Sequence, residues 1–358
     1  MEQAQSHTLT ELTVLTLLTK YDQAHPEQDA GTRAMRHLVF DQFVAVCGDL
    51  SLDYFSLICA EQYRSALLGG WRPRTAEELS RMNCRLSGRA RQGLAKGFGP
   101  TTAASYLKMI RVPFRWWAIR QRLNVDFWGQ LPPIKRVRRP VKVYSDDRLA
   151  KLLAEARRVQ DGGLTEARVL IMATAGLRRA ECQQLTESDI DWDRGTITVQ
   201  PHEETDSTWR WTPKDRDWRT VPLVDQAKSV LLARRHVLPA GQPYLLLSAD
   251  RYAYLMYVRS QGQMTDRQRK LPDENHRPFR RLRTRAGTAG LSQKHLRSTA
   301  ATNWLRDGID LRSVQALMGH SEIATTEKYL TPDGGAVEKA RTLGAARLVR
   351  LAGGTPPA

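Results

Sequence analysis

Two short segments of the chain hold arginine residues suited to binding a phosphate group. Glu181 lies three residues after Arg178 in the first, and Arg297 lies three residues after Lys294 in the second. An arginine guanidinium is planar, keeps its charge and can donate two parallel hydrogen bonds to phosphate oxygens. We expect the two segments to lie on different helices.

A third segment supplies a histidine and a tyrosine. His320 follows Arg297 by 23 residues, and Tyr329 follows His320 by 9. A tyrosine hydroxyl has a reference pKa of about 10, so it is a poor nucleophile until nearby cations favour the phenolate. Each residue alone has an ordinary explanation, such as a solvated arginine, a histidine at a helix end or a half-buried tyrosine. The hypothesis of phosphate chemistry therefore depends on the joint pattern.

Hydrophobic periodicity predicts the elements that position these segments. A helix over 165–175 leads into the first arginine segment, and Ser292 is expected to cap the helix that carries Arg297. Alternating residues predict two strands, over 196–200 and 220–224, in an otherwise helical region. The remaining C-terminal helices are expected over residues 296–305, 311–318, 323–330 and 336–348.

The N-terminal part of the chain is predicted to be all-helical. A fourth helix begins at Pro100, and Pro113 inside it is expected to kink or split it. The Gly- and Arg-rich segment 69–99 is expected to hold a basic helix between loops. The first three helices follow from apolar residues at helical spacing over 12–21, 35–46 and 57–68.

A basic, proline-rich segment separates the two halves of the chain. Residues 132–142 read PPIKRVRRPVK, with three prolines, five basic residues and no acidic one. This composition predicts an extended linker rather than a helix. The expected domains are an all-helical domain, a linker, a mixed but mostly helical domain and a flexible tail, over residues 8–131, 132–143, 144–350 and 351–358.

The charge of the chain indicates a polyanionic partner. The 358 residues carry a formal net charge of +17. Residues 51–142 hold 18 basic against 5 acidic side chains, and residues 251–300 hold 12 against 3. A solubilising surface would spread the charge evenly, so two concentrated zones favour binding to a nucleic-acid backbone. The candidate DNA contacts are Arg72, Arg74, Arg85, Arg89, Arg91, Lys108, Lys135, Arg136, Arg138 and Arg139.

The sequence also excludes several classes of protein. No apolar run approaches the roughly 18 residues of a membrane span, and the first residues lack the pattern of a signal peptide. The four cysteines are far apart and form no CxxC pair, so neither a zinc site nor a disulfide framework is indicated. We therefore expect a cytoplasmic, nucleoid-associated protein with no membrane partner.

Four motifs together resemble the catalytic domain of the tyrosine recombinases, the phage integrase family. Their order and spacing match the family pattern, which makes the joint signal strong. The resemblance covers residues 144–350 well and is looser over 8–131, where residues 102–118 resemble the last of the family's core-binding helices. The motifs read TAGLRRAECQQL over 174–185, TPK over 212–214 followed by RTVPL, KHLR over 294–297 and LMGHSEIATTEKY over 317–329.

The resemblance implies a mainly α-helical, integrase-like DNA breaking-rejoining fold, in which the mixed domain contains a small antiparallel β-sheet. It also implies site-specific recombination, in which a tyrosine attacks a DNA phosphodiester, forms a 3′-phosphotyrosyl link and frees a 5′ hydroxyl. This link stores the phosphodiester energy, so no nucleotide cofactor or metal is expected. The residues carried over are Tyr329 as nucleophile, Arg178, Arg297 and His320 as phosphate ligands, Lys214 as general acid and Glu181 as a group that orients Arg178.

The sequence departs from the family pattern beside Arg297. The position three residues earlier is most often histidine in the family and is Lys294 here, while His295 lies one residue too late. We expect Lys294 to contact a phosphate or the leaving group, because a lysine of ordinary pKa is a poor base at neutral pH. The proton acceptor for Tyr329 stays open.

The resemblance implies double-stranded DNA as the partner and homo-oligomers on it, with a dimer at each site and a tetramer in the synapse. Integration, excision and resolution of a DNA element all fit this activity. Two alternatives remain open. A type IB topoisomerase-like enzyme would relax DNA with the same chemistry, and a catalytically silent DNA-binding protein could keep the fold.

Overall fold

Two compact units divide the chain, Met1–Arg139 and Pro140–Ala358, and each is described by itself. The division falls inside the segment 132–143 that is predicted as a linker. The predicted helix over 336–348 and the tail over 351–358 lie outside the described residues. The computed structural model describes residues 12–123, 126–135, 140–214, 218–264 and 276–330.

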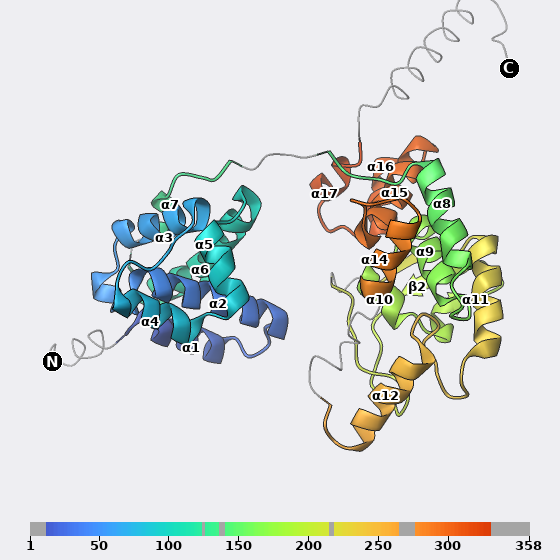
Figure 1. The fold of residues 1–358 in the computed structure, drawn as a ribbon, viewed down its shortest axis with the longest axis horizontal. Coiled ribbons are helices and arrows are strands. Elements are labelled where there is room, and N and C mark those ends of the chain that lie inside the picture. The colour runs from blue at the N-terminus through green and yellow to red at the C-terminus, as the bar shows by residue number, and fades with distance from the viewer. Residues whose placement is uncertain (1–11, 124–125, 136–139, 215–217, 265–275, 331–358) are drawn as a thin grey trace, which may run out of the picture. The chain divides into compact units, whose positions relative to one another are not determined.

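The first unit is all-helical within its described residues, as predicted (Figure 1). Phe43, Tyr63 and Ile110 are fully buried in a core that α1, α2, α3 and α6 share. A short 3-10 helix, η1 (Leu52–Tyr54), lies between α2 and α3. The helices are α1 (Val14–Ala24), α2 (Ala30–Cys47), α3 (Leu57–Gly69), α4 (Ala76–Arg85), α5 (Gly88–Lys96), α6 (Pro100–Arg120) and α7 (Phe127–Gln130).

The Arg-rich segment 69–99 forms two helices, α4 and α5, where one was expected. Thr75 and Glu78 form a capping box at the start of α4, in which the Glu78 N–H donates to Thr75 Oγ1 at 3.1 Å. Ser87 caps α5 through its side chain alone, which accepts from the Ala90 N–H at 3.4 Å. None of the residues of α4 is buried, so its basic side chains lie on the surface of the unit.

Pro113 does not split α6, which excludes the split and leaves the expected kink as a prediction. The helix continues from Pro100 to Arg120 over 21 residues with Pro113 inside it. A proline inside a helix removes one hydrogen bond and costs about 3 kcal/mol. Ile110 and Phe114 are buried beside it against α1, α2 and α3, and burial of such side chains contributes about 2 kcal/mol each. Packing therefore offsets the local cost.

The second unit combines helices with one small antiparallel sheet, as predicted. The sheet has the order β1-β2-β3 and pairs Ile197 with Val221 at its centre. Its strands are β1 (Ile190–Asp191), which follows the 3-10 helix η2 (Glu187–Asp189), β2 (Thr196–Val199) and β3 (Arg219–Pro222). The helices are α8 (Asp146–Arg157), α9 (Leu164–Thr174), α10 (Arg179–Gln184), α11 (Asp225–Val237), α12 (Ala249–Ser260), α14 (His276–Arg285), α15 (Gln293–Arg306), α16 (Leu311–Met318) and α17 (Ala324–Glu327).

The central helix of this unit is α9. Nine of its eleven residues are buried, and it packs against α8, α10, α11 and α15. Most of its side chains are apolar, and a helix of this kind is stable only where neighbours cover it on most sides, which explains this position. The end of α9 therefore lies deep in the unit, and the residues that follow it are held on a rigid support.

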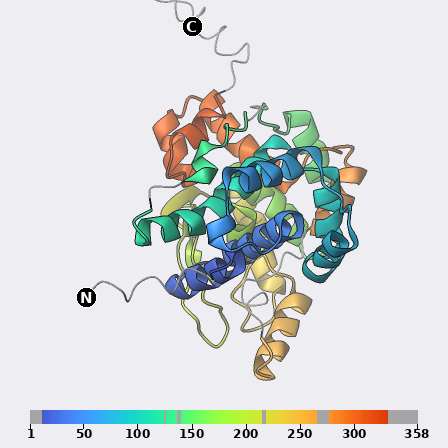
Figure 2. The same ribbon diagram turned by 90° about the vertical axis from the view of Figure 1, so that its left-hand side faces the viewer.

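A smaller apolar cluster lies beside the main core of this unit. Trp209, Tyr244, Tyr252 and Leu255 form it between α12 and the loop that precedes β3. In both views α12 lies at the opposite end of the unit from α16 and α17 (Figure 1 and Figure 2). Within the described residues, no helix has the length and apolar character needed to cross a bilayer.

Candidate active site

Arg178 lies at the junction between α9 and α10. Gly176 has a φ of +64°, which favours glycine, and a Cβ there would lie 3.0 Å from the Trp304 ring. The chain turns sharply here and places Arg178 at the N-cap of α10. The Arg178 backbone N–H donates to Glu181 Oε2 at 2.6 Å, and its Nη1 donates to Oε1 at 2.8 Å. The three-residue spacing in the sequence is thus the spacing of a capping pair.

Glu181 is the shared anion of three arginines. Its side chain is 3% exposed, and besides Arg178 it accepts hydrogen bonds from Nη1 and Nη2 of Arg219. Arg297 Nη1 lies 3.8 Å from Glu181 Oε2. Burial alone would raise the pKa of Glu181, but the Arg219 hydrogen bonds and the charges of Arg219 and Arg178 outweigh it and hold the pKa below its ordinary value. Glu181 is therefore a carboxylate at neutral pH.

Arg297 is buried at the start of α15 and points toward the ends of α9 and α16. Its Nη1 donates to the Gly176 carbonyl at 2.6 Å, and its Nη2 donates to the Met318 carbonyl. Burial and the neighbouring charge of Arg178 lower the pKa of Arg297 to about 10. The guanidinium stays charged at neutral pH, and two helix ends fix its position.

His320 and Tyr329 lie next to each other beyond α16. The chain leaves α16 through Gly319, which has a left-handed φ of +57°. His320 Nδ1 lies 2.8 Å from Thr326 Oγ1, and its ring is nearly parallel to that of Tyr329, at 6.2 Å between centroids and 13° between planes. Tyr329 is 5% exposed, so its ring is packed in place rather than solvated.

The arrangement also indicates the tautomer of His320. Arg297 Nη2 lies 3.4 Å from His320 Nε2. Because a guanidinium only donates, Nε2 accepts, and the ring hydrogen of neutral His320 lies on Nδ1 and is donated to Thr326. Direct contacts therefore connect Arg178, Glu181, Arg297 and His320. Tyr329 belongs to the same cluster because its ring stacks on that of His320.

Sequence reasoning missed Arg219. It lies at the start of β3 with 6% of its side chain exposed, and its Nε donates to the Leu317 carbonyl at 2.9 Å. It thus joins Glu181 to the end of α16, which precedes His320. The signal was present in the strand pattern: Arg219 alternates with Val221 and Leu223, which are both buried. An arginine on the inward side of a strand needs a buried partner.

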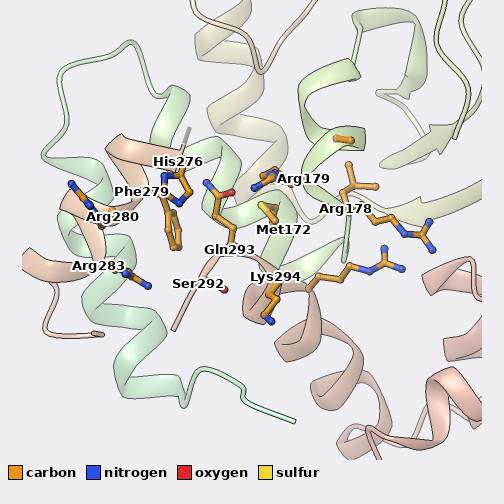
Figure 3. Close-up of a pocket in the computed structure, with 13 residues that line it drawn as sticks. Met172, Arg178, Arg179, His276, Phe279, Arg280, Arg283, Ser292, Gln293 and Lys294 are labelled. Atoms are coloured by element: carbon orange, nitrogen blue, oxygen red, sulfur yellow. The ribbon is translucent and has the colours of Figure 1, made fainter. Parts of the chain in front are cut away.

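A cavity of about 480 Å³ opens beside the cluster (Figure 3). Arg178, Arg297 and Lys294 line it, and α14 adds Arg280 and Arg283. Apolar side chains from α9, α10 and α14 also line it, together with further polar groups such as Arg179 and Gln293. Cationic groups beside an apolar floor suit an anion that carries an apolar part, as a nucleotide does.

Lys294 is exposed on the first turn of α15, as the lining of this cavity requires. The neighbouring His295 has a structural role, because its Nδ1 accepts a hydrogen bond from the Ser292 N–H at 2.8 Å. Burial and the charge of Lys294 lower the pKa of His295. His295 is thus a neutral cap of α15 and does not replace the family's histidine.

The structure does not bring Lys214 into this set of direct contacts among the described residues. Lys214 is exposed and lies in the connection between β2 and β3, next to residues 215–217, which are outside the described residues.

The candidate DNA contacts of the first unit lie mostly on its surface. Arg85 forms an ion pair with Asp41 at 3.5 Å, and Arg91 donates to Asn83. Arg136, Arg138 and Arg139 lie outside the described residues. The exposed members of the set are Arg72, Arg74, Arg85, Arg89, Lys108 and Lys135.

The sequence is similar to known recombinases. Residues 142–334 match the sequence profile of the phage integrase family. Tyrosine recombinase XerC of Bifidobacterium longum strain DJO10A is 32% identical over 201 residues, which cover 55% of this chain and 49% of that protein. XerC of Bacillus subtilis strain 168 is 26% identical over 237 residues, which cover 65% of this chain and 71% of that protein. The chain thus spans about half the length of the Bifidobacterium relative.

Solved structures share the fold. The Tn1549 transposon integrase in complex with transposon right end DNA has a TM-score of 0.63 at 16% identity, over 94% of this chain and 100% of that chain. A lambda integrase dimer bound to a COC′ core site has a TM-score of 0.54 at 14% identity, over 89% of this chain and 77% of that chain. These similarities confirm the mainly helical, integrase-like fold.

Proposed function

The chain belongs to the phage integrase family, and from this premise we propose that it is a site-specific DNA recombinase acting through a 3′-phosphotyrosyl intermediate. The observation that carries the proposal is the contact between Arg297 and His320, whose ring lies parallel to that of Tyr329. Phosphate ligands and a nucleophile thus meet at one place. The proposed activity also fits the similarity of the chain to the tyrosine recombinases named XerC.

In the proposed reaction, Arg178 and Arg297 bind the scissile phosphate. Each is held in advance: Arg178 by Glu181 and the Gly319 carbonyl, and Arg297 by carbonyls at two helix ends. Donors fixed in this way need no reorganisation when charge builds up on the phosphate oxygens in the transition state. Each such donor contributes roughly 3–4 kcal/mol to lowering the barrier.

Tyr329 then attacks the phosphorus. Its phenolic oxygen gives its proton to water and bonds to phosphorus, while the bond between phosphorus and the 5′ oxygen breaks. The electron pair of that bond stays on the 5′ oxygen, which takes a proton from Lys214 as general acid. Religation reverses these steps, so the DNA supplies all the energy and no cofactor is needed.

The cavity beside the cluster would accommodate the DNA next to the scissile phosphate. Lys294 lines it from the start of α15, and Arg280 and Arg283 line it from α14. These groups would contact neighbouring phosphates or the leaving strand. The exposed basic residues of the first unit and the linker arginines would hold the duplex more widely.

We further propose that the protein acts on double-stranded DNA in the cytoplasm, as a dimer at each site and a tetramer in the synapse. The transposon integrase was solved with DNA and the lambda integrase as a DNA-bound dimer, which supports this reading. Covalent capture on a nicked duplex tests the central reaction, because wild-type protein should form a protein–DNA adduct that Tyr329→Phe does not form.

A further inference from the structure

The segment that carries Lys214 is fixed at both of its ends. Val199 of β2 pairs with Arg219 of β3, and beyond the strand His202 pairs with Trp211 in a separate antiparallel bridge. Residues 200–201 separate the two pairs on one side, and residues 212–218 separate them on the other. Lys214 therefore lies in the sequence between two residues, Trp211 and Arg219, that are each paired with the chain around β2.

The Arg219 end of the segment that carries Lys214 is part of the candidate site. Arg219 binds Glu181 through its Nη atoms and the Leu317 carbonyl through Nε at 2.9 Å. The end of the Lys214 segment is thus rigidly connected to the carboxylate that also holds Arg178.

The Trp211 end is fixed through His202. The two residues exchange backbone hydrogen bonds, from His202 N to Trp211 O at 2.9 Å and from Trp211 N to His202 O at 3.0 Å. The His202 ring lies 5.6 Å from the Trp211 ring, and its Nε2 donates to Asp189 Oδ1 at 3.0 Å. Asp189, at the end of η2, has a side chain that is only 3% exposed.

The position of Asp189 is fixed by further hydrogen bonds to its carboxylate. The Thr186 N–H and hydroxyl both donate to its Oδ2 at 2.8 Å, and Gln200 Nε2 donates to its Oδ1 at 3.1 Å. A single cross-strand pair beyond the end of a strand is weak by itself. Trp211 also packs against the main core of the unit, and the side-chain hydrogen bond between His202 and Asp189 adds to this packing by fixing the strand that pairs with Trp211.

We propose that His202 is a positioning residue that, through Asp189 and Trp211, sets where Lys214 meets the leaving 5′ oxygen. Lys214 lies three residues after Trp211, a span of at most about 10 Å, so a displacement of Trp211 is passed on to it. The inference rests on the proposed function, in which Lys214 is the general acid. A general acid must lie within hydrogen-bond distance of the atom that it protonates. The rate of DNA cleavage should therefore depend on how His202 and Asp189 hold Trp211.

A sulfur leaving group separates this role from a general loss of structure. Replacing the bridging 5′ oxygen with sulfur gives a leaving group whose conjugate thiol has a pKa near 8.5, so it departs as a thiolate without a proton. An enzyme that delivers the proton poorly is slow on the oxygen substrate and normal on the sulfur substrate. A damaged enzyme is slow on both.

The experiment compares single-turnover cleavage of the two substrates by the full chain. The duplex is one selected by covalent capture from a random-sequence pool, and it is then made with oxygen or sulfur at the scissile position. His202→Ala should be slowed on the order of tenfold on oxygen and by less than about twofold on sulfur. His202→Gln keeps a donor toward Asp189 and should recover most of the rate. His236→Ala, an exposed histidine of α11, is the matched control and should behave as wild type.

The reference variant is Lys214→Ala. Sulfur should restore the cleavage rate of Lys214→Ala. If it does so while His202→Ala is slowed equally on both substrates, the positioning role of His202 is overturned and the proposed function stands. No loss on oxygen in His202→Ala overturns the positioning role as well. If Lys214→Ala itself loses equally on both substrates, the general-acid assignment fails and the inference fails with it. Comparing two substrates on one preparation removes the effect of any partly unfolded fraction.

Discussion

The guanidinium of Arg219 donates to both carboxylate oxygens of Glu181, at 3.1 Å from Nη1 to Oε1 and 2.5 Å from Nη2 to Oε2. The two residues are separated by 38 positions in the sequence and both are buried. The same carboxylate caps Arg178 and lies 3.8 Å from Arg297. One ion pair thus connects the sheet to both arginines of the proposed phosphate site.

Breaking this pair should destabilise the protein. Arg219→Met leaves Glu181 with fewer donors in a buried place and should lower the free energy of unfolding by about 3–5 kcal/mol, measured by chemical denaturation. Arg235→Met is the control, because Arg235 forms an exposed pair with Glu187 at 2.7 Å and should cost about 0–1 kcal/mol. Equal losses in the two variants would contradict the central place of the Arg219 pair.

The charge of Glu181 should make stability depend on pH in a defined direction. Its pKa in the folded protein is below the ordinary value of 4.5, so the carboxylate stabilises the fold fully above that value and loses this effect as the pH falls through the lowered pKa. The difference in unfolding free energy between wild type and Glu181→Gln should therefore be constant from pH 7 to 5 and shrink below about 4.5. Glu187→Gln is the control, because the Glu187 side chain is 42% exposed whereas that of Glu181 is 3% exposed. A difference that grows on acidification would contradict this account.

The linker arginines should contribute to binding of DNA of any sequence. Changing Arg136, Arg138 and Arg139 to alanine should weaken binding uniformly and reduce the slope of log affinity against log salt by roughly 2–3 units. Fluorescence anisotropy over a salt series measures the slope. A charge-matched triple variant at the exposed positions Arg148, Arg158 and Arg235 should leave the slope unchanged. A linker variant with the wild-type slope would show that these arginines face solvent.

The helices around the candidate site could be predicted well because they carry both periodic apolar residues and end signals. The expected helix over 311–318 is observed as α16 (Leu311–Met318), between the cap Asp310 and Gly319. The expected helix over 165–175 is α9 (Leu164–Thr174). Ser292 is the N-cap of α15, as predicted. The last helix before Tyr329 is shorter than the predicted 323–330, since α17 is only Ala324–Glu327.

The contacts between distant segments could not be predicted from local pattern. The partnership of Arg219 with Glu181 depends on how β3 pairs with β2, and strands of four residues give a weak signal. The same holds for His202, whose role follows from its pairing with Trp211 and from the buried Asp189. Glu181 was expected to orient Arg178 only, whereas it is shared by three arginines.

The most direct test of the account is covalent capture by the proposed nucleophile. A nicked suicide duplex lets the cleaved strand diffuse away, so wild-type protein should form a protein–DNA adduct that survives denaturing electrophoresis. Tyr329→Phe should form no adduct while still retarding the same duplex in a native gel. Tyr257→Phe, an exposed tyrosine of α12, should form the adduct at the wild-type rate. An adduct that persists in Tyr329→Phe, or its absence from wild type on a duplex that the protein binds, would contradict the assignment of Tyr329 as nucleophile.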